Sequence, residues 1–311
     1  MILIQTILPI FAIIGLGFVA VRTGYLDRAT VAPAGQIVIR IAMPALIFVA
    51  LASTPIDQAL ELPFLLAYAL GSLAVMGATF ALARLALGLT ALEASVAALG
   101  VSMANSGFMG FPIGQALLGA EDAIRIFAHC LVVENILILP LALLLLALYG
   151  PAEAAGIRTR IARDVLRNPL MIALAAGAAF SALGLSLPGP AQSVLEMLTR
   201  LSAPLALLVI GGMLATLPVA GRTTSVGLIV LGKLGLHPLA VWLAMALVPG
   251  VSPLMAAGGV LFAAMPMITI FPLLAGKAGQ GQLAAFGLLA ATVTSFATVP
   301  LVIHLLGLVP L

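Results

Sequence analysis

The chain has 311 residues, of which 63% are hydrophobic and 7% are charged, with a formal net charge of +3. Soluble domains carry about 25% charged residues, so this composition excludes a soluble protein and predicts an integral membrane protein. The basic residues lie mostly in short loops, where they indicate membrane orientation rather than a nucleic-acid-binding surface.

Apolar runs, separated by turn or charged residues, divide the chain into membrane-spanning segments. At about 20 apolar residues per crossing, the length accommodates about ten helices in one compact unit. The first run begins at once, without a basic segment before it or a cleavage pattern after it, which predicts a retained helix and no signal peptide. The predicted spans are residues 2–21, 31–53, 62–88, 92–119, 122–149, 169–187, 198–217, 226–248, 254–276 and 283–307.

The largest polar loop follows the fifth span, and its arginines predict the orientation. Cytoplasmic loops of membrane proteins are enriched in Lys and Arg, so this loop is placed in the cytoplasm and both termini outside. Only Arg125 and Arg200 then lie outside. The excess of Arg over Lys suggests a bacterial source, so we expect the plasma (bacterial inner) membrane. The cytoplasmic basic residues would be Arg22, Arg28, Arg84, Arg158, Arg160, Arg163, Arg167, Arg222 and Lys277.

Five predicted spans lie on each side of this loop, and the two halves share features in the same order. Pro44 in the second span matches Pro204 in the seventh, and Phe111-Pro112 in the fourth matches Phe271-Pro272 in the ninth. Because five is odd, the second half enters the membrane from the opposite face. Residues 1–150 and 151–311 are therefore predicted to be two inverted five-helix repeats, in an all-α polytopic membrane protein.

The fourth and ninth spans are each interrupted by polar residues, glycine or proline. Hydrocarbon cannot satisfy the backbone groups that a broken helix frees, so breaks persist only where protein, water or a ligand does so. The amide groups at the start of a half-helix, together with its dipole, form an anion site. We predict a substrate site from both breaks; the alternative is a pair of proline kinks repaired by neighbouring helices. The candidate residues are Asn105, Ser106, Gly107, Phe108, Gly110, Pro112, Met265, Pro266, Thr269 and Pro272.

Within these breaks, different residue types suggest different roles. Pro112 and Pro272 suit the first position of half-helices, where proline has no donor to lose. Gly107 and Gly110 permit a ligand to approach the backbone closely. The Asn105 side chain can bind a ligand or cap exposed backbone.

Ionisable residues inside predicted spans are further candidates, because a charge at the bilayer centre costs several kcal/mol and tends to mark function. Glu134, followed by Asn135, either carries a coupling proton or serves as counter-ion to Lys233. Lys233 either balances the negative ends of half-helices, attracts substrate, or extends to the interface. Arg40 could contact substrate or extend to the interface, and His129 could be functional or simply packed.

Several kinds of chemistry have no residues to support them. The four Asp residues lie in predicted loops or at helix ends, and neither a zinc-protease motif nor a phosphate-binding loop is present. We therefore expect no enzyme activity, no metal, no cofactor and no ATP hydrolysis. Transport would be driven by a gradient, with H⁺ or Na⁺ as the coupling ion. The lone Cys130 cannot form a disulfide within the chain.

The sequence resembles the auxin efflux carrier family, whose bacterial members are often labelled malonate or other organic-acid transporters. The resemblance rests on Pro44, the 105–112 run, the 233–238 segment and the 265–272 segment. It implies inverted five-helix repeats like those of bile-acid transporters and sodium/proton antiporters, with crossing fourth and ninth helices. A scaffold domain (helices 1, 2, 6 and 7), often a homodimer interface, would support a transport domain (helices 3–5 and 8–10) that moves like an elevator. Met265, where a second Asn would match the breaks, and the short central loop argue against auxin specificity.

These observations predict a secondary active transporter of a small organic anion, a carboxylate such as malonate. A sodium-coupled carrier of an amphipathic or neutral solute on the same fold is the alternative. A membrane enzyme or a sensor subunit is the rival from another class, without residues that support it.

Overall fold

The computed structural model describes residues 2–52, 61–150, 167–217 and 223–308. Six of its helical stretches are long and apolar enough to cross a membrane, and four shorter apolar helices accompany them. This is the architecture of an all-helical polytopic membrane protein. The six are Arg28–Ala52, Leu62–Leu85, Ala120–Tyr149, Gly189–Thr216, Ser225–Leu247 and Gly281–Leu305; the four are Leu8–Arg22, Ala91–Ser102, Pro169–Ala182 and Pro253–Ala263.

The described elements follow the predicted spans in order. In the first half they are α1 (Ile2–Arg22), η1 (Arg28–Thr30), α2 (Val31–Ile37), η2 (Val38–Ala42), α3 (Met43–Ala52), α5 (Leu62–Leu85), α6 (Ala91–Ser102), η3 (Ser106–Gly110), α7 (Phe111–Leu118), α8 (Ala120–Val133), η4 (Glu134–Ile138) and α9 (Leu139–Tyr149). In the second half they are α11 (Pro169–Ala182), α12 (Gly189–Thr216), α13 (Thr223–Leu231), η6 (Gly232–Leu236), α14 (His237–Leu247), α15 (Pro253–Ala263), α16 (Phe271–Gly276) and α17 (Gly281–Leu305).

In the described ranges, four turns of wider, π-helical winding interrupt the helices, and each is followed closely by a proline. A proline inside a helix lacks the N–H and its ring clashes with the carbonyl four residues earlier, and an added residue per turn relieves both problems. Such turns free backbone groups and redirect side chains in the middle of a span. The pairs are η2 with Pro44, η3 with Pro112, η4 with Pro140 and η6 with Pro238.

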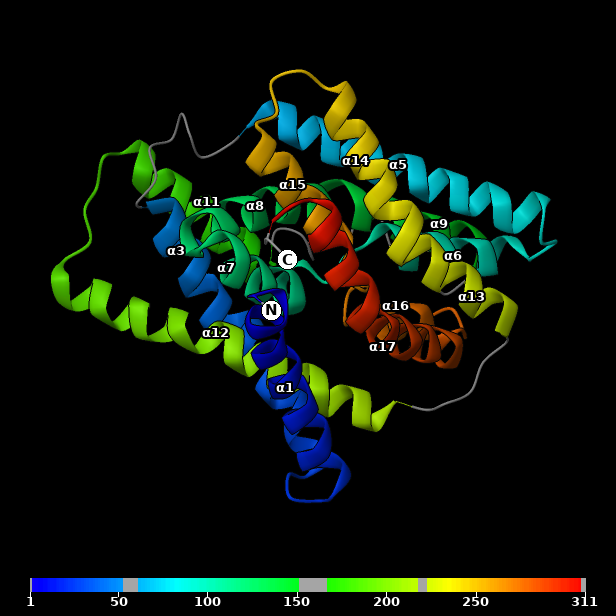
Figure 1. The fold of residues 1–311 in the computed structure, drawn as a ribbon, viewed down its shortest axis with the longest axis horizontal. Helices are drawn as coiled ribbons and strands as arrows, with labels where there is room; N and C mark the ends of the chain where they lie inside the picture. Colours follow the sequence, from blue (N-terminus) through cyan, green and yellow to red (C-terminus); the bar gives the residue numbers. More distant parts are fainter. Residues whose placement is uncertain (1, 53–60, 151–166, 218–222, 309–311) are drawn as a thin grey trace.

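Helices α1, α3, α11 and α12 pack on one another. α1 crosses and packs on α12, and α3 contacts both α11 and α12, as Figure 1 shows in the lower and left parts of the view. Close approach depends on small residues: a side chain at Gly177 of α11 would meet Phe48 and Leu51 of α3. Small residues at helix crossings are the usual device for packing in membranes, where no hydrophobic force drives association.

The other helices pack mainly among themselves. α5 contacts α6 and α14, α14 contacts α15, and α17 contacts α13 and α16. Figure 1 places α5, α6, α9, α13 and α14 together on the right of the view. Helix α7 and turn η3 contact α12, so one broken helix borders the group formed by α1, α3, α11 and α12.

The seventh predicted span differs from the structure at its start. Helix α12 begins at Gly189, with proline in its first turn, nine residues before the predicted start at residue 198. The first turns carry exposed polar residues such as Gln192 and Ser193, and the apolar run therefore begins only after the helix has started. The central-loop residues Glu153, Arg158, Arg160, Arg163 and Asp164 lie outside the described residues.

Candidate functional site

The two predicted breaks are real discontinuities, and they touch each other. α6 ends at Ser102 and winding resumes at Ser106, while α15 ends at Ala263 and α16 begins at Phe271. Between them, Ala104 and Met267 form an isolated antiparallel bridge. The amide of Asn105 donates a 2.8 Å hydrogen bond to the carbonyl of Pro266. Each break therefore satisfies part of the backbone that the other exposes.

Asn105 caps the first of these half-helices. Its Oδ1 accepts a 3.3 Å hydrogen bond from the amide of Phe108, and its carbonyl accepts from Met109 at 3.1 Å and Gly110 at 3.0 Å. Pro112 lies in the first turn of α7, as expected, but winding already begins one turn earlier, at Ser106. The π-helical turn η3 supplies this additional turn. In the second half, Pro272 does lie in the first turn of α16.

Glu134 lies beside the start of this half-helix, buried to 3% exposure. The hydroxyl of Ser106 donates a 2.6 Å hydrogen bond to its Oε1, and the hydroxyl of Tyr68 donates to the same oxygen at 2.9 Å. Two donors on one oxygen hold the carboxyl group in place, and hydrogen bonds to an ionised carboxylate are the stronger kind.

Lys233 lies at the other break, fully buried. Its Nζ donates a 2.7 Å hydrogen bond to the carbonyl of Ala263, the last residue of α15. A 2.6 Å contact joins Nζ to Nδ1 of His237. Lys233 thus lies at the negative end of a half-helix, which is one of the two functional roles considered for it, and it does not extend to the interface.

Helix α5 links the two charged residues. Tyr68, which binds Glu134, and Ser72, whose Oγ lies 3.0 Å from Nε2 of His237, are one turn apart and fully buried. With an ammonium donor at Nδ1, the hydrogen of His237 is on Nε2 and is donated to Ser72. Tyr68 and Ser72 were missed in the sequence; two polar residues spaced by four in an apolar helix are the signal that points to them.

The remaining residues of the predicted site differ in what surrounds them. Thr269 is 9% exposed, and its Oγ1 has no hydrogen-bond partner within the described part of the chain. The two glycines face protein: a Cβ at Gly107 would lie 3.1 Å from Cε of Met43, and one at Gly110 would lie 2.8 Å from Cδ1 of Phe262. Their absent side chains make room for neighbouring residues. Phe108 and Met265 are buried.

Asn135 and Arg40 do not take part in the hydrogen bonds at the two breaks. Asn135 donates to the carbonyl of Leu131 at 3.0 Å and accepts a 3.0 Å hydrogen bond from Nδ2 of Asn168. Asn168 caps α11, so Asn135 joins η4 to α11, one of the helices that pack with α1, α3 and α12. Arg40 is exposed on the π-helical turn η2.

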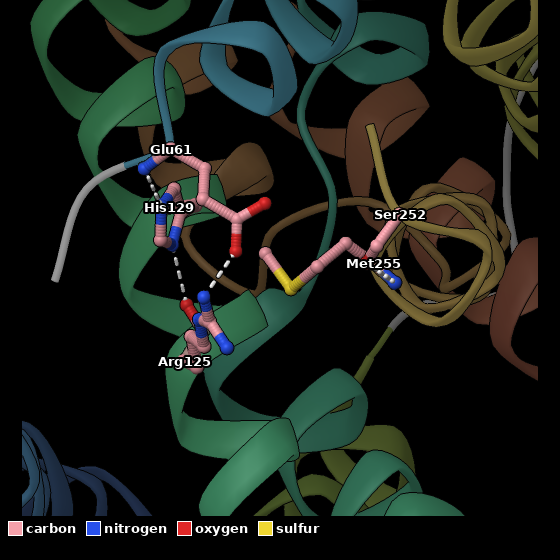
Figure 2. A network of polar contacts seen from close by, with 5 residues as sticks. All are labelled: Glu61, Arg125, His129, Ser252 and Met255. Carbon is pink, nitrogen blue, oxygen red and sulfur yellow. Dashed lines mark hydrogen bonds and ion pairs between the residues drawn. The ribbon is translucent and has the colours of Figure 1, made fainter. Parts of the chain in front are cut away.

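His129 belongs to a separate network that joins α8 to Glu61, the residue before α5, shown in Figure 2. Its Nε2 accepts a 2.7 Å hydrogen bond from the amide of Glu61, and its Nδ1 donates to the carbonyl of Arg125 at 2.7 Å. The Arg125 guanidinium pairs with the Glu61 carboxylate at 2.5 Å. Both ring nitrogens of His129 are therefore occupied by hydrogen bonds within the protein, which favours a structural role for this residue.

Over the described residues, no group of three or more His, Cys, Asp or Glu side chains is placed to hold a metal ion. The chemistry that this arrangement offers is therefore polar and electrostatic: amide and hydroxyl donors at the two breaks, with one buried acid and one buried base beside them.

Comparison with known proteins identifies the family. A family model described as membrane transport protein matches residues 2–303. The chain belongs to this family. It is the auxin efflux carrier family that the sequence resembles, and the expected absence of enzyme activity agrees with its transporter relatives.

Two relatives extend the match. A Rhizobium meliloti (strain 1021) protein named "Putative malonate transporter" is 27% identical over 303 residues, which cover 96% of this chain and 94% of the relative. A Methanothermobacter thermautotrophicus (strain Delta H) protein named "Uncharacterized transporter" is 24% identical over 207 residues, covering 67% of this chain and 66% of the relative.

Proposed function

We propose that this membrane transporter is a secondary active carrier of a small organic anion, a carboxylate such as malonate, in the plasma membrane. The observation that carries the proposal is the contact of the two breaks, where the Asn105 amide meets the Pro266 carbonyl. Breaks at corresponding places in two halves mark the substrate site of many transporters. The name of the Rhizobium meliloti relative supports malonate as the first substrate to test.

The proposed architecture is ten transmembrane helices in two inverted repeats, with both termini outside. Helices 1, 2, 6 and 7 (α1, α2–α3, α11 and α12) form the scaffold, through which the protein dimerises. Helices 3–5 and 8–10 form the transport domain, which carries substrate in an elevator-like movement. The separate packing of these two sets supports this division.

In this site the substrate carboxylate binds at the start of η3. The amides of Ser106 and Gly107 are the first in the winding, where a helix offers its amides no carbonyl of its own. Together with the side-chain Nδ2 of Asn105 and the Thr269 hydroxyl they provide donors, and the positive end of the half-helix favours an anion. Lys233 supplies a compensating positive charge from the second break.

Glu134 couples binding to a proton. Its Oε1 is held by Ser106, at the point where the anion would bind. Two adjacent carboxylates repel each other in a poorly solvated site, so an anion and a proton on Glu134 favour each other's binding.

Counterflow in proteoliposomes tests the proposal. Vesicles loaded with unlabelled malonate should accumulate labelled malonate, faster when a pH gradient supplies protons from the side of uptake. Asn105→Ala should abolish most of this exchange while the protein still purifies as a folded species. Malonate exchange equal to that of protein-free vesicles, and equal exchange by Asn105→Ala for every organic acid tried, would each count against the proposal.

A sodium-coupled carrier of an amphipathic or neutral solute is the second candidate. The apolar surroundings of the second break, with Met265 and Met267 buried, favour it. Replacement of Na⁺ by choline decides between the two: it should leave malonate exchange unchanged under the main proposal and abolish uptake under this one.

A further inference from the structure

The buried charges of this protein are one acid and one base. Among the residues whose burial the structure describes, Glu134 and Lys233 are the only Asp, Glu, Lys or Arg side chains that are buried, at 3% and 0% exposure. They lie close enough to interact electrostatically. They form no direct ion pair, since the one ion pair in the described ranges joins Arg125 and Glu61.

The two charges are held by different breaks and by one helix. Lys233 is bonded to the carbonyl end of α15, and Glu134 to the start of η3 through Ser106. Tyr68 and Ser72 of α5 hold Glu134 and the Lys233 partner His237. All these groups belong to the proposed transport domain, so they would cross the membrane together.

The remaining titratable groups around Glu134 do not alter this balance. Tyr68 faces it from α5, Cys130 from the preceding helix α8 and Lys233 from η6. His237 accepts a hydrogen bond from Lys233, which requires that its Nδ1 carry no proton. The empty site is thus neutral when Glu134 is ionised and Lys233 is charged.

We infer that the site balances one carboxylate of substrate with one proton, carried by Glu134, so that each substrate molecule crosses with a single proton whatever its own charge. The inference rests on the proposed function. A charge moved through the bilayer centre costs several kcal/mol. Lys233, a protonated Glu134 and one substrate carboxylate sum to zero. The proton is taken up with the substrate on one side and released with it on the other.

For malonate the inference has a numerical consequence. At about pH 7.5 both malonate carboxyl groups are ionised, so the dianion with one proton carries one net negative charge. A tenfold malonate gradient should then be balanced by about 59 mV of membrane potential, and a gradient of one pH unit should shift that balance by about 59 mV again. Transport of the dianion alone would balance at about 30 mV without a pH shift.

The reversal potential of malonate flux in proteoliposomes, set with valinomycin and potassium, measures this. Wild-type protein should give about 59 mV per tenfold gradient, shifted by pH and unchanged by sodium. Glu134→Gln keeps an oxygen acceptor for Ser106 and Tyr68, and its malonate flux should reverse at about 30 mV and ignore pH. Glu121→Gln, an exposed acid at the start of α8, should behave as wild type.

The outcomes separate the inference from the proposed function. Malonate flux with a pH-independent reversal near 30 mV in wild type, a sodium-dependent shift, or a potential-independent flux with two protons would each overturn the inference while leaving a carboxylate carrier. An unaltered pH shift in Glu134→Gln would also overturn it. The absence of malonate flux through folded wild-type protein would remove the proposed function itself.

Discussion

The ammonium group of Lys233 lies 2.7 Å from the carbonyl oxygen of Ala263, where α15 ends inside the protein. The end of a helix leaves carbonyl groups without partners and carries a partial negative charge. The buried ammonium group donates a hydrogen bond to one of these carbonyls and also neutralises the partial negative charge. Its side chain in turn is held by His237 and, through His237, by Ser72. The second break is therefore stabilised by a charge, just as the first break is bonded to Glu134.

Lys233→Gln should destabilise the protein by about 1.5–3 kcal/mol, because it removes the charged donor that bonds the carbonyl of Ala263. Thermal unfolding in detergent, followed by tryptophan fluorescence or light scattering, measures the change. Lys277→Gln is the control: Lys277 is exposed next to α16 and should cost less than about 0.5 kcal/mol. Equal stability of the two variants would show that Lys233 does not hold the end of α15.

Asn105→Ala should reduce malonate affinity by about tenfold or more, since a lost hydrogen bond to a charged ligand costs about 1.5–3 kcal/mol. It also removes the cap on the Phe108 amide, which costs about 1 kcal/mol of stability. Thr90→Ala separates these effects, because Thr90 caps the exposed start of α6 in the same way. Isothermal titration should show weakened binding only for Asn105→Ala; weakened binding in both variants would assign the loss to stability.

Gly110→Ala should destabilise the protein by about 1–3 kcal/mol, because the new Cβ would lie 2.8 Å from the Phe262 ring and force it to move. Gly77→Ala provides the opposite sign. Gly77 lies within α5, and a Cβ added there would meet nothing within 4 Å, so alanine should stabilise by up to about 1 kcal/mol through helix propensity. Melting temperatures of both variants check the prediction, and a stabilising Gly110→Ala would contradict the packing described for the first break.

Joining Asn135 to Asn168 should stop transport if the proposed domains move past each other, because their 3.0 Å hydrogen bond crosses between the two sets of helices. Cysteines at both positions, in a Cys130→Ser background, allow cross-linking with a short bifunctional thiol reagent. Cysteines at Phe48 and Phe180, whose rings lie 5.5 Å apart within the proposed scaffold, are the matched control. Transport that survives the first cross-link, or is lost equally in both, would argue against an elevator movement.

Much of the fold could be predicted because membrane helices depend on local sequence. About 20 apolar residues are needed for each crossing, and proline or glycine in such a run marks a break. The helix starts near residues 31, 62, 91, 120 and 253 follow this reasoning closely. Helix α12 was mispredicted because its first turns are polar, and apolar runs report the part of a helix within lipid rather than its whole length.

The local sequence by itself determined a membrane protein, two interrupted helices and the buried residues Asn105, Glu134 and Lys233 as candidates, since hydrocarbon penalises every unpaired polar group. Only the tertiary structure decided their partners. The joining of Asn105 to Pro266, the placement of Lys233 at the end of α15 and the use of Tyr68 and Ser72 to hold both charges each require helices distant in sequence to pack together. The same is true of His129, whose ring nitrogens form hydrogen bonds with the backbone of Glu61 and Arg125. Such contacts carry no local pattern, because hydrogen-bond partners across helices are set by packing and not by spacing along the chain.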